Sequence, residues 1–166
     1  MRKELLWLFL VLMMSCQKVS KETKALTVES KEATKYPITK TDAEWRAQLT
    51  DVEYYVLRKA ATENAFTSEL LNNKEKGTYV CAGCDTPLFR SEHKYKSGTG
   101  WPSFDREIEG NVAYTVDYKI GYARTEEHCA TCGGHLGHVF NDGPIATTGK
   151  RHCINGVALN FVPDPK

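Results

Sequence analysis

The segments Tyr79-Val-Cys-Ala-Gly-Cys84 and Cys129-Ala-Thr-Cys132 decide the fold of this chain. Each contains a CxxC unit, and 44 residues separate the two units. Two CxxC turns that converge on one ion form a closed tetrahedral site of four thiolates, which saturates the coordination of zinc. The interval between them has room for a sheet or a large loop. We therefore predict one structural zinc ion, held by Cys81, Cys84, Cys129 and Cys132.

Other arrangements of these cysteines are open from the sequence. An exported chain can join the four as disulfides, with three possible connectivities. Either CxxC unit alone can act as a redox pair. The second unit can also form a metal site with His135 and His138, which follow it closely. The first unit would then have no role, so the site of four cysteines is the better interpretation.

The sequence around the CxxC units predicts a mainly β domain with short helices at its N-terminal side. Thr41, with Glu44 three residues on, is typical of a helix capping box, and Asp51 is expected to cap a second short helix. From Gly77 onward, β-rich runs alternate with Gly, Pro, Asn and Asp. The runs expected to form strands are Thr78–Val80, Val112–Val116, Ile120–Arg124, Val139–Phe140 and Val157–Val162.

The length has room for one ordinary domain or two very small ones, and the composition indicates a globular protein. The chain has 166 residues, of which 41% are hydrophobic and 26% charged, a profile unlike that of disordered or fibrous proteins. The formal net charge is +1, so there is no basic excess of the kind that favours nucleic-acid binding. We therefore expect no nucleic-acid partner, and nothing in the sequence demands more than a monomer.

The N-terminal residues have the features of an export signal. Leu5 to Met14 is an apolar run of ten residues, which is too short for a stable transmembrane helix and fits a signal peptide. The following Ser15-Cys16 resembles a bacterial lipobox, in which Cys16 would receive lipid and become the mature N-terminus. A plain secretory signal or a short retained anchor is the alternative. We expect a lipoprotein-like signal over residues 1–16 and a location in the bacterial cell envelope, with membrane attachment by the lipid anchor only.

A polar segment separates this signal from the predicted domain. Residues 17–40 contain six lysines and three glutamates with few large apolar side chains. Such a segment cannot bury enough apolar surface to offset its ordering entropy. We predict a flexible tether over residues 17–40 and the folded domain over residues 41–166.

Cys153 is the cysteine left over after lipidation and metal binding. If Arg151-His-Cys-Ile-Asn155 is extended, Arg151, Cys153 and Asn155 face one side. A guanidinium and an amide beside a thiol can stabilise its nucleophilic thiolate, although a lone cysteine can equally be a buried structural residue. His135 and His138 are candidate acid–base groups, and Trp101 can form a wall for a methyl or thioether group.

Several strings, in this order, resemble the methionine-R-sulfoxide reductases of the B type, the MsrB family. The resemblance runs from about Asp42 to Val162. The strings are Tyr79-Val-Cys-Ala-Gly-Cys84, Ser97-Gly-Thr-Gly-Trp-Pro-Ser-Phe104, Gly133-Gly-His-Leu-Gly-His-Val-Phe140 and Arg151-His-Cys-Ile-Asn155.

The resemblance implies a mainly β fold of two small antiparallel sheets in a barrel- or tent-like domain, with a structural zinc held by the paired CxxC units. It implies reduction of methionine-R-sulfoxide in peptides and proteins. Cys153 matches the catalytic cysteine, and Trp101, His138 and Asn155 match pocket residues. We assign Cys153, His138 and Asn155 to catalysis, with a sulfenic acid formed on Cys153, and we assign Trp101, His135 and Arg151 to substrate binding.

The chain departs from the family pattern at Thr99. Many members carry a resolving cysteine at this position. We therefore expect the oxidised Cys153 to be reduced by an external thiol, such as a thioredoxin-like protein. Two other functions are compatible with the sequence. One is a zinc-stabilised thiol–disulfide oxidoreductase that uses a CxxC unit, and the other is a non-enzymatic zinc-binding module.

Overall fold

The computed structural model describes residues 36–166. The predicted signal peptide at residues 1–16, including Cys16, lies outside the described residues, as does the predicted tether from residue 17 to residue 35. Both therefore stay predictions. The last residues of the predicted tether, 36–40, are described, and there Ile38 packs against the core while its amide donates to the Thr131 carbonyl. Among residues 36–166, no helix is long and apolar enough to cross a membrane.

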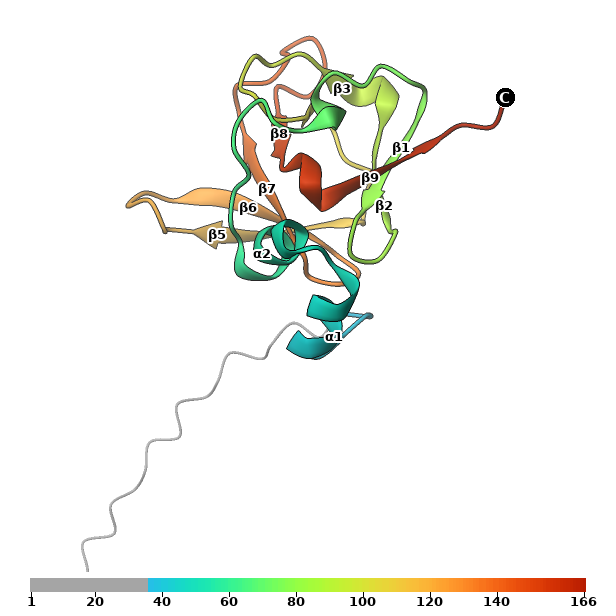
Figure 1. Cartoon of the computed structure of the whole chain (residues 1–166). Helices are drawn as coiled ribbons and strands as arrows, with labels where there is room; N and C mark the ends of the chain where they lie inside the picture. The colour runs from blue at the N-terminus through green and yellow to red at the C-terminus, as the bar shows by residue number, and fades with distance from the viewer. Residues whose placement is uncertain (1–35) are drawn as a thin grey trace, which may run out of the picture. The chain divides into compact units, whose positions relative to one another are not determined.

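The domain contains two antiparallel sheets, as predicted (Figure 1). The smaller sheet has the strand order β2-β1-β9, formed by β1 (Gly77–Cys81), β2 (Pro87–Arg90) and β9 (Leu159–Pro163). The larger sheet has the order β3-β4-β8-β7-β6-β5. Its strands are β3 (Lys94–Tyr95), β4 (Ser103–Phe104), β5 (Val112–Asp117), β6 (Arg124–Cys129), β7 (His135–Phe140) and β8 (Arg151–Ile154).

Buried aromatic side chains hold the two sheets together. Tyr79 and Phe89 come from the smaller sheet, and Phe104 comes from the larger sheet. The ring centroids of Phe89 and Phe104 are 4.4 Å apart in a stacked arrangement, and those of Tyr79 and Phe104 are 5.0 Å apart edge to face. All three side chains are fully buried. Burying such large apolar surfaces supplies much of the stability of a core, so this contact fixes one sheet against the other.

Two short helices precede the sheets, as expected. Helix α1 (Asp42–Gln48) begins with the predicted capping box between Thr41 and Glu44. The expectation that Asp51 caps helix α2 (Asp51–Lys59) is wrong, because Thr50 is the N-cap and accepts a hydrogen bond from the Glu53 amide. Asp51 lies in the first turn instead, where a negative charge favours the helix dipole.

The hairpin between β5 and β6 corrects another expectation. The run Ile120–Arg124 was expected to form a strand, but β6 begins only at Arg124. Gly121 has a φ of +87° and its amide donates to the Tyr118 carbonyl, so this segment turns the chain. Ile120 and Tyr122 are 51% and 59% exposed, which shows that apolar residue type alone does not identify a strand here.

The remaining strand predictions are confirmed with shifted ends. Val139–Phe140 belongs to a longer strand, β7, which begins at His135. Val157 and Ala158 lie in a 3-10 turn, η3 (Gly156–Ala158), and β9 begins at Leu159. Two further 3-10 turns are η1 (Glu69–Leu71) and η2 (Ser91–His93). The η3 turn places the segment after Cys153 against the N-terminal part of the domain, where the candidate site lies.

Candidate active site and metal centre

The four predicted ligand cysteines lie together. The sulfur of Cys81 is 3.7 Å from that of Cys132, and the sulfur of Cys84 is 3.5 Å from that of Cys129. All four sulfurs lie within 4.8 Å of one another. A tetrahedron with zinc–sulfur bonds of 2.3 Å has edges of about 3.8 Å, whereas a disulfide bond is about 2.05 Å long. The four thiols therefore form a set that can hold a metal ion, and the disulfide alternative is wrong.

The turn after each CxxC unit has the shape of a metal knuckle. Gly133 has a φ of +70°, and its amide donates to the Cys129 carbonyl. Asp85 also has a positive φ, of +57°, and its amide donates to the Cys81 carbonyl. Aspartate tolerates this left-handed conformation better than most residues other than glycine. Both knuckles therefore form, although only the second has the residue best suited to the turn.

A small cavity of about 120 Å³ lies on one face of the larger sheet. Strand register builds it, because Cys153 in β8 pairs with His138 in β7 on one side and with Ser103 in β4 on the other. Residues directly opposite in antiparallel strands share a face and lie in contact range. The lining residues are Thr62, Trp101, Arg124, Gly137, His138, Phe140, Cys153 and Asn155.

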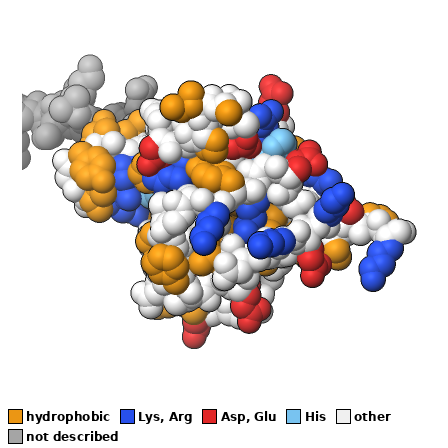
Figure 2. Space-filling view, turned by 90° about the horizontal axis from the view of Figure 1, so that it is seen from above, with side chains coloured by type: hydrophobic (Ala, Val, Ile, Leu, Met, Phe, Trp, Pro, Cys, Tyr) orange, Lys and Arg blue, Asp and Glu red, His pale blue; other side chains and the backbone are white. Residues whose placement is uncertain are grey.

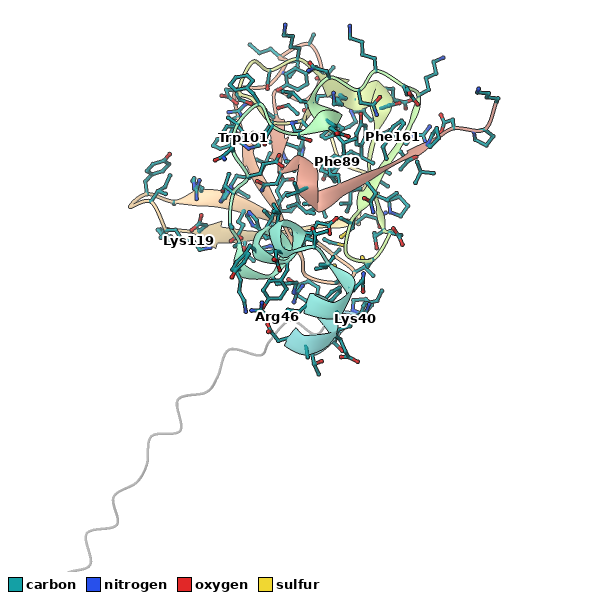
Figure 3. The ribbon with its side chains drawn as sticks, in the orientation of Figure 1. Lys40, Arg46, Phe89, Trp101, Lys119 and Phe161 are labelled. Carbon is teal, nitrogen blue, oxygen red and sulfur yellow. The ribbon has the colours of Figure 1, made fainter. Side chains whose placement is uncertain are left out.

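The structure brings four of the six predicted catalytic and substrate residues to this cavity. Cys153, His138, Asn155 and Trp101 line it, whereas His135 and Arg151 do not. Figure 3 shows Trp101 beside β8, away from Phe161 in β9. Both side-chain groups of Asn155 bond to backbone, because Oδ1 accepts from the Glu63 amide and Nδ2 donates to the Leu136 carbonyl. Asn155 therefore ties two segments of the cavity wall together.

Arg151 lies beside the cavity in an ion pair. Its Nε and Nη2 each lie 2.9 Å from a carboxylate oxygen of Asp142, and its guanidinium lies 4.3 Å from the ring centroid of Phe140. Burial raises the pKa of Cys153, and the charge of Arg151 opposes part of this rise. The arginine that lines the cavity is Arg124, which the sequence analysis did not select.

His138 is held by an acidic residue that the sequence analysis also missed. Its Nε2 lies 2.9 Å from Oδ2 of Asp117, the last residue of β5. The same carboxylate oxygen pairs with Arg124. Burial lowers the pKa of His138 below its ordinary value of 6.5, while Asp117 acts in the opposite direction. The imidazole is therefore oriented by Asp117 and uncharged at neutral pH.

Cys153 lies within reach of a group of hydroxyls. Its sulfur is 3.7 Å from Oγ1 of Thr99, and Ser97 Oγ lies 2.9 Å from the same Thr99 oxygen and 2.7 Å from Ser103 Oγ. Burial raises the pKa of the Cys153 thiol above its ordinary value of 9.0, although the Thr99 hydroxyl and Arg151 act in the opposite direction. The resting residue is therefore a thiol.

Glu63 connects the cavity wall to the segment after Cys153. Its carboxylate accepts hydrogen bonds from the amides of Gly156 and Val157, and its carbonyl accepts one from Nε1 of Trp101. Glu63 is only 8% exposed. Its partners lie 38 to 94 residues away in sequence, so no local pattern marked it as a site residue.

Replacing Glu63 by alanine is expected to lower the free energy of unfolding by about 2–4 kcal/mol, because two buried amides lose a charged acceptor. Denaturant unfolding measures this change. Glu69→Ala is the matched control, because Glu69 is exposed, and we expect its change to stay within about 0.5 kcal/mol. Equal stability of the two variants would contradict the bonding role of Glu63.

Comparisons with known proteins identify the family of this chain. Residues 49–163 match the family model described as the SelR domain. A peptide methionine sulfoxide reductase MsrB of Leptospira interrogans is 51% identical over 76% of this chain and 96% of that protein. MsrB proteins of Burkholderia multivorans and Leifsonia xyli are 50% and 48% identical, over 79% and 78% of this chain and 92% and 94% of theirs.

The match to the SelR model covers more than half of the chain, and these relatives share about half of their residues with it over nearly their whole length. Figure 2 shows hydrophobic, basic and acidic side chains on the face of the domain seen from above. The chain belongs to the SelR family, the family of the peptide methionine sulfoxide reductases MsrB.

Proposed function

We propose that this chain reduces methionine-R-sulfoxide in peptides and proteins back to methionine. The observation that carries the proposal is the pairing of Cys153 with His138 across two strands, in a cavity that Trp101 also lines. A nucleophile and a proton-transfer group on one face, beside an aromatic wall, suit a small thioether-like substrate. Family membership supports sulfoxide reduction, and the R epimer follows from the B-type resemblance, since each epimer has its own enzyme class.

In the proposed reaction, His138 takes the proton of the Cys153 thiol, and the thiolate sulfur forms a bond to the sulfoxide sulfur. The sulfoxide oxygen receives this proton from His138, directly or through water. The resulting hydroxyl then moves to the Cys153 sulfur, and the sulfur–oxygen and sulfur–sulfur bonds to the substrate break. The products are methionine and a sulfenic acid on Cys153. The sum balances without another reactant, because one thiol and one sulfoxide give one sulfenic acid and one thioether. Trp101 packs on the substrate methyl group, while Asn155 and Glu63 hold the cavity wall in place.

The four-cysteine site is proposed to bind zinc with a structural role. Four thiolates are the donor set of structural zinc sites, and they leave no coordination position for substrate. None of the four cysteines lines the cavity. The ion would join the end of β1 to the turn between β6 and β7, and so would hold the two sheets together at one end.

Separate assays of the R and S epimers of a methionine sulfoxide peptide test the function, with dithiothreitol as the reductant. We expect turnover of the R epimer only. Turnover of the S epimer alone would contradict the stereochemical proposal. A folded protein with one zinc ion and no turnover of either epimer would favour the non-enzymatic zinc-binding module. Disulfide exchange that survives loss of Cys153 would favour the thiol–disulfide oxidoreductase.

We propose that an external thiol, such as a thioredoxin-like protein, reduces the sulfenic acid. Among residues 36–166, the four cysteines other than Cys153 all lie in the metal centre, and Thr99 stands where many family members have a resolving cysteine. One turnover without reductant is therefore expected to leave a sulfenic acid, or its adduct with a trapping reagent, on Cys153. Mass spectrometry measures this, and a disulfide within the monomer would contradict it.

The variant Thr99→Cys is expected to restore an internal pathway. Its sulfur would replace a hydroxyl that lies 3.7 Å from the Cys153 sulfur, so a shift of less than about 2 Å would bring the two atoms to disulfide length. After one turnover, mass spectrometry should then show a disulfide between residues 99 and 153. Thr99→Ser is the control, which keeps the hydroxyl and should give the sulfenic acid only.

The pH dependence follows from the two shifted pKa values. At pH values between the lowered pKa of His138 and the raised pKa of Cys153, these two residues together bind one titratable proton. At rest this proton lies on the thiol, and the imidazole is neutral. In the reactive form the same proton lies on the imidazole, so the thiolate–imidazolium pair has the same total protonation as the resting pair. We therefore expect kcat/KM to be constant between about 6.5 and 9. It should fall below this range as both groups become protonated, and above it as the proton is lost. A single titration step centred within the range would contradict this assignment.

We propose that Cys16 carries a lipid that anchors a monomeric enzyme to the bacterial cell envelope, with the part of the predicted tether before residue 36 as the flexible link. The support is the apolar run that ends at Ser15-Cys16 and the polar composition after it. Labelling with a radioactive fatty acid tests this proposal. We expect label on the natural chain and none on Cys16→Ser, and equal labelling of both would contradict it.

A further inference from the structure

We propose that Glu126, His128 and His135 form a second metal site, which binds a divalent transition-metal ion such as Zn²⁺ beside the active-site cavity. Glu126 and His128 take no part in the proposed reaction, and His135 does not line the cavity. The site is separate from the four-cysteine centre, with which it shares no ligand.

Two neighbouring strands bring the three residues together. Glu126 and His128 are two residues apart in β6, and His135 begins β7, the adjacent strand in the sheet (Figure 1). His128 pairs with His135 across the two strands, next to a shift of register between Glu127 and His128. Such a shift re-aims side chains locally. The pairing therefore places two imidazoles and a carboxylate in one cluster.

The distances within the cluster fit ligands of a single ion. Oε1 of Glu126 lies 2.5 Å from Nδ1 of His135 and 3.3 Å from Nε2 of His128. Bonds of about 2.0–2.2 Å in a tetrahedral site place ligand atoms about 3.3–3.6 Å apart. The His128 contact already has this spacing. The Glu126 carboxylate would have to move away from His135 by about 1 Å to admit an ion.

His128 lacks the hydrogen bonds expected of a largely buried imidazole. Its side chain is 15% exposed, and its Nδ1 is buried with no hydrogen-bond partner among residues 36–166. Unpaired buried polar atoms in native structures are uncommon and often mark an ion or a water that completes the site. An ion bound at Nε2 would add a strong bond to a ring that now has only the Glu126 contact at 3.3 Å.

The donor set selects the class of metal. Two imidazoles and one carboxylate are the ligands of catalytic zinc sites, which keep an open position for water, and imidazole favours zinc, cobalt and nickel over magnesium and calcium. The side chains of Glu126 and His135 are 12% and 4% exposed, so the site is enclosed, with entry past the more exposed His128. The four thiolates should bind the first zinc ion, and this cluster should bind the second.

The site lies beside the proton-transfer group of the proposed reaction. The ring centroid of His135 is 5.6 Å from that of His138. A dication held by His135 would oppose protonation of His138. We therefore expect metal binding here to lower turnover reversibly. This consequence rests on the proposed function, whereas the binding itself does not.

Cobalt titration of the zinc-loaded chain tests the binding, in the Cys153→Ser background so that the active-site thiol cannot act as a ligand. We expect uptake of one Co²⁺ ion, seen as visible absorption bands. The sulfur-to-cobalt charge-transfer band, which would show exchange of Co²⁺ into the four-cysteine centre, should be absent. His128→Gln should weaken this binding at least about tenfold. His93→Gln is the matched control, because His93 also faces two carboxylates, Glu92 and Asp105, but on different ring nitrogens.

The outcomes separate the two parts of the proposal. Failure to bind a second ion, or equal binding by the natural residue and His128→Gln, would overturn the site. Turnover of the protein with its natural Cys153 is measured with and without added Zn²⁺ and then with a chelator. Inhibition that the chelator reverses, and that His128→Gln abolishes, would support the link to His138. Binding without any loss of turnover would overturn that link and leave the site established.

Discussion

Replacing Cys153 by serine is expected to lower kcat/KM for a methionine-R-sulfoxide peptide by at least about 10³-fold. A serine hydroxyl stays protonated at neutral pH and is a far weaker nucleophile toward sulfur than a thiolate. A serine oxygen also cannot form a sulfenic acid, so the proposed covalent reaction cannot take place. Steady-state kinetics with dithiothreitol measure the loss.

This loss should occur without any change in the fold. Cys153 is not one of the four cysteines of the metal centre, so the serine variant should keep one zinc ion and the thermal midpoint of the natural chain within a few degrees. Thr99→Ser is the matched control near the same sulfur, and it should keep most of the activity. Normal turnover by a folded, zinc-loaded Cys153→Ser protein would contradict the proposed mechanism.

Replacing Cys129 by serine is expected to lower the free energy of unfolding by at least about 3 kcal/mol, because the chain loses its metal centre. Cys129 is fully buried at the end of β6, and its sulfur lies 3.5 Å from that of Cys84. The proposed ion would join segments 44 residues apart in sequence, so its loss would free two parts of the chain at once. Metal analysis and thermal unfolding measure both effects.

Cys153→Ser is the matched control for this experiment, because it also replaces a thiol by a hydroxyl, at a partly buried position outside the metal centre. The Cys129 variant should contain little zinc and unfold at a much lower temperature, while the Cys153 variant should change little in either respect. A strong chelator should destabilise the natural chain in the same way. A Cys129→Ser protein of natural stability would contradict a structural metal centre.

Much of the site was predictable because its signals are local. Each CxxC unit supplies two metal ligands within four residues, and the structure brings all four sulfurs within 4.8 Å of one another. The capping box at Thr41 is another local signal, since its two hydrogen bonds join residues three apart. The order of the family strings identified Cys153, His138 and Trp101 before any contact between them was known.

The residues that the sequence analysis missed act through long-range contacts. Asp117 orients His138 from 21 residues away, and Glu63 binds the amide of Val157 from 94 residues away. Arg124 lines the cavity, whereas the predicted Arg151 is paired with Asp142. No periodicity or spacing reports such contacts, because they depend on which strands pair and in which register.

The sequence by itself determined the chemistry available to this protein: the paired CxxC units, the unpaired Cys153 and the strings that identify the family. Only the tertiary structure decided which of these groups meet. The register of β7 against β8 sets His138 opposite Cys153, and the shift of register in β6 gathers Glu126, His128 and His135. The physical reason is that side-chain direction alternates along a strand, so a change of one residue in register would turn every one of these groups to the other face of the sheet.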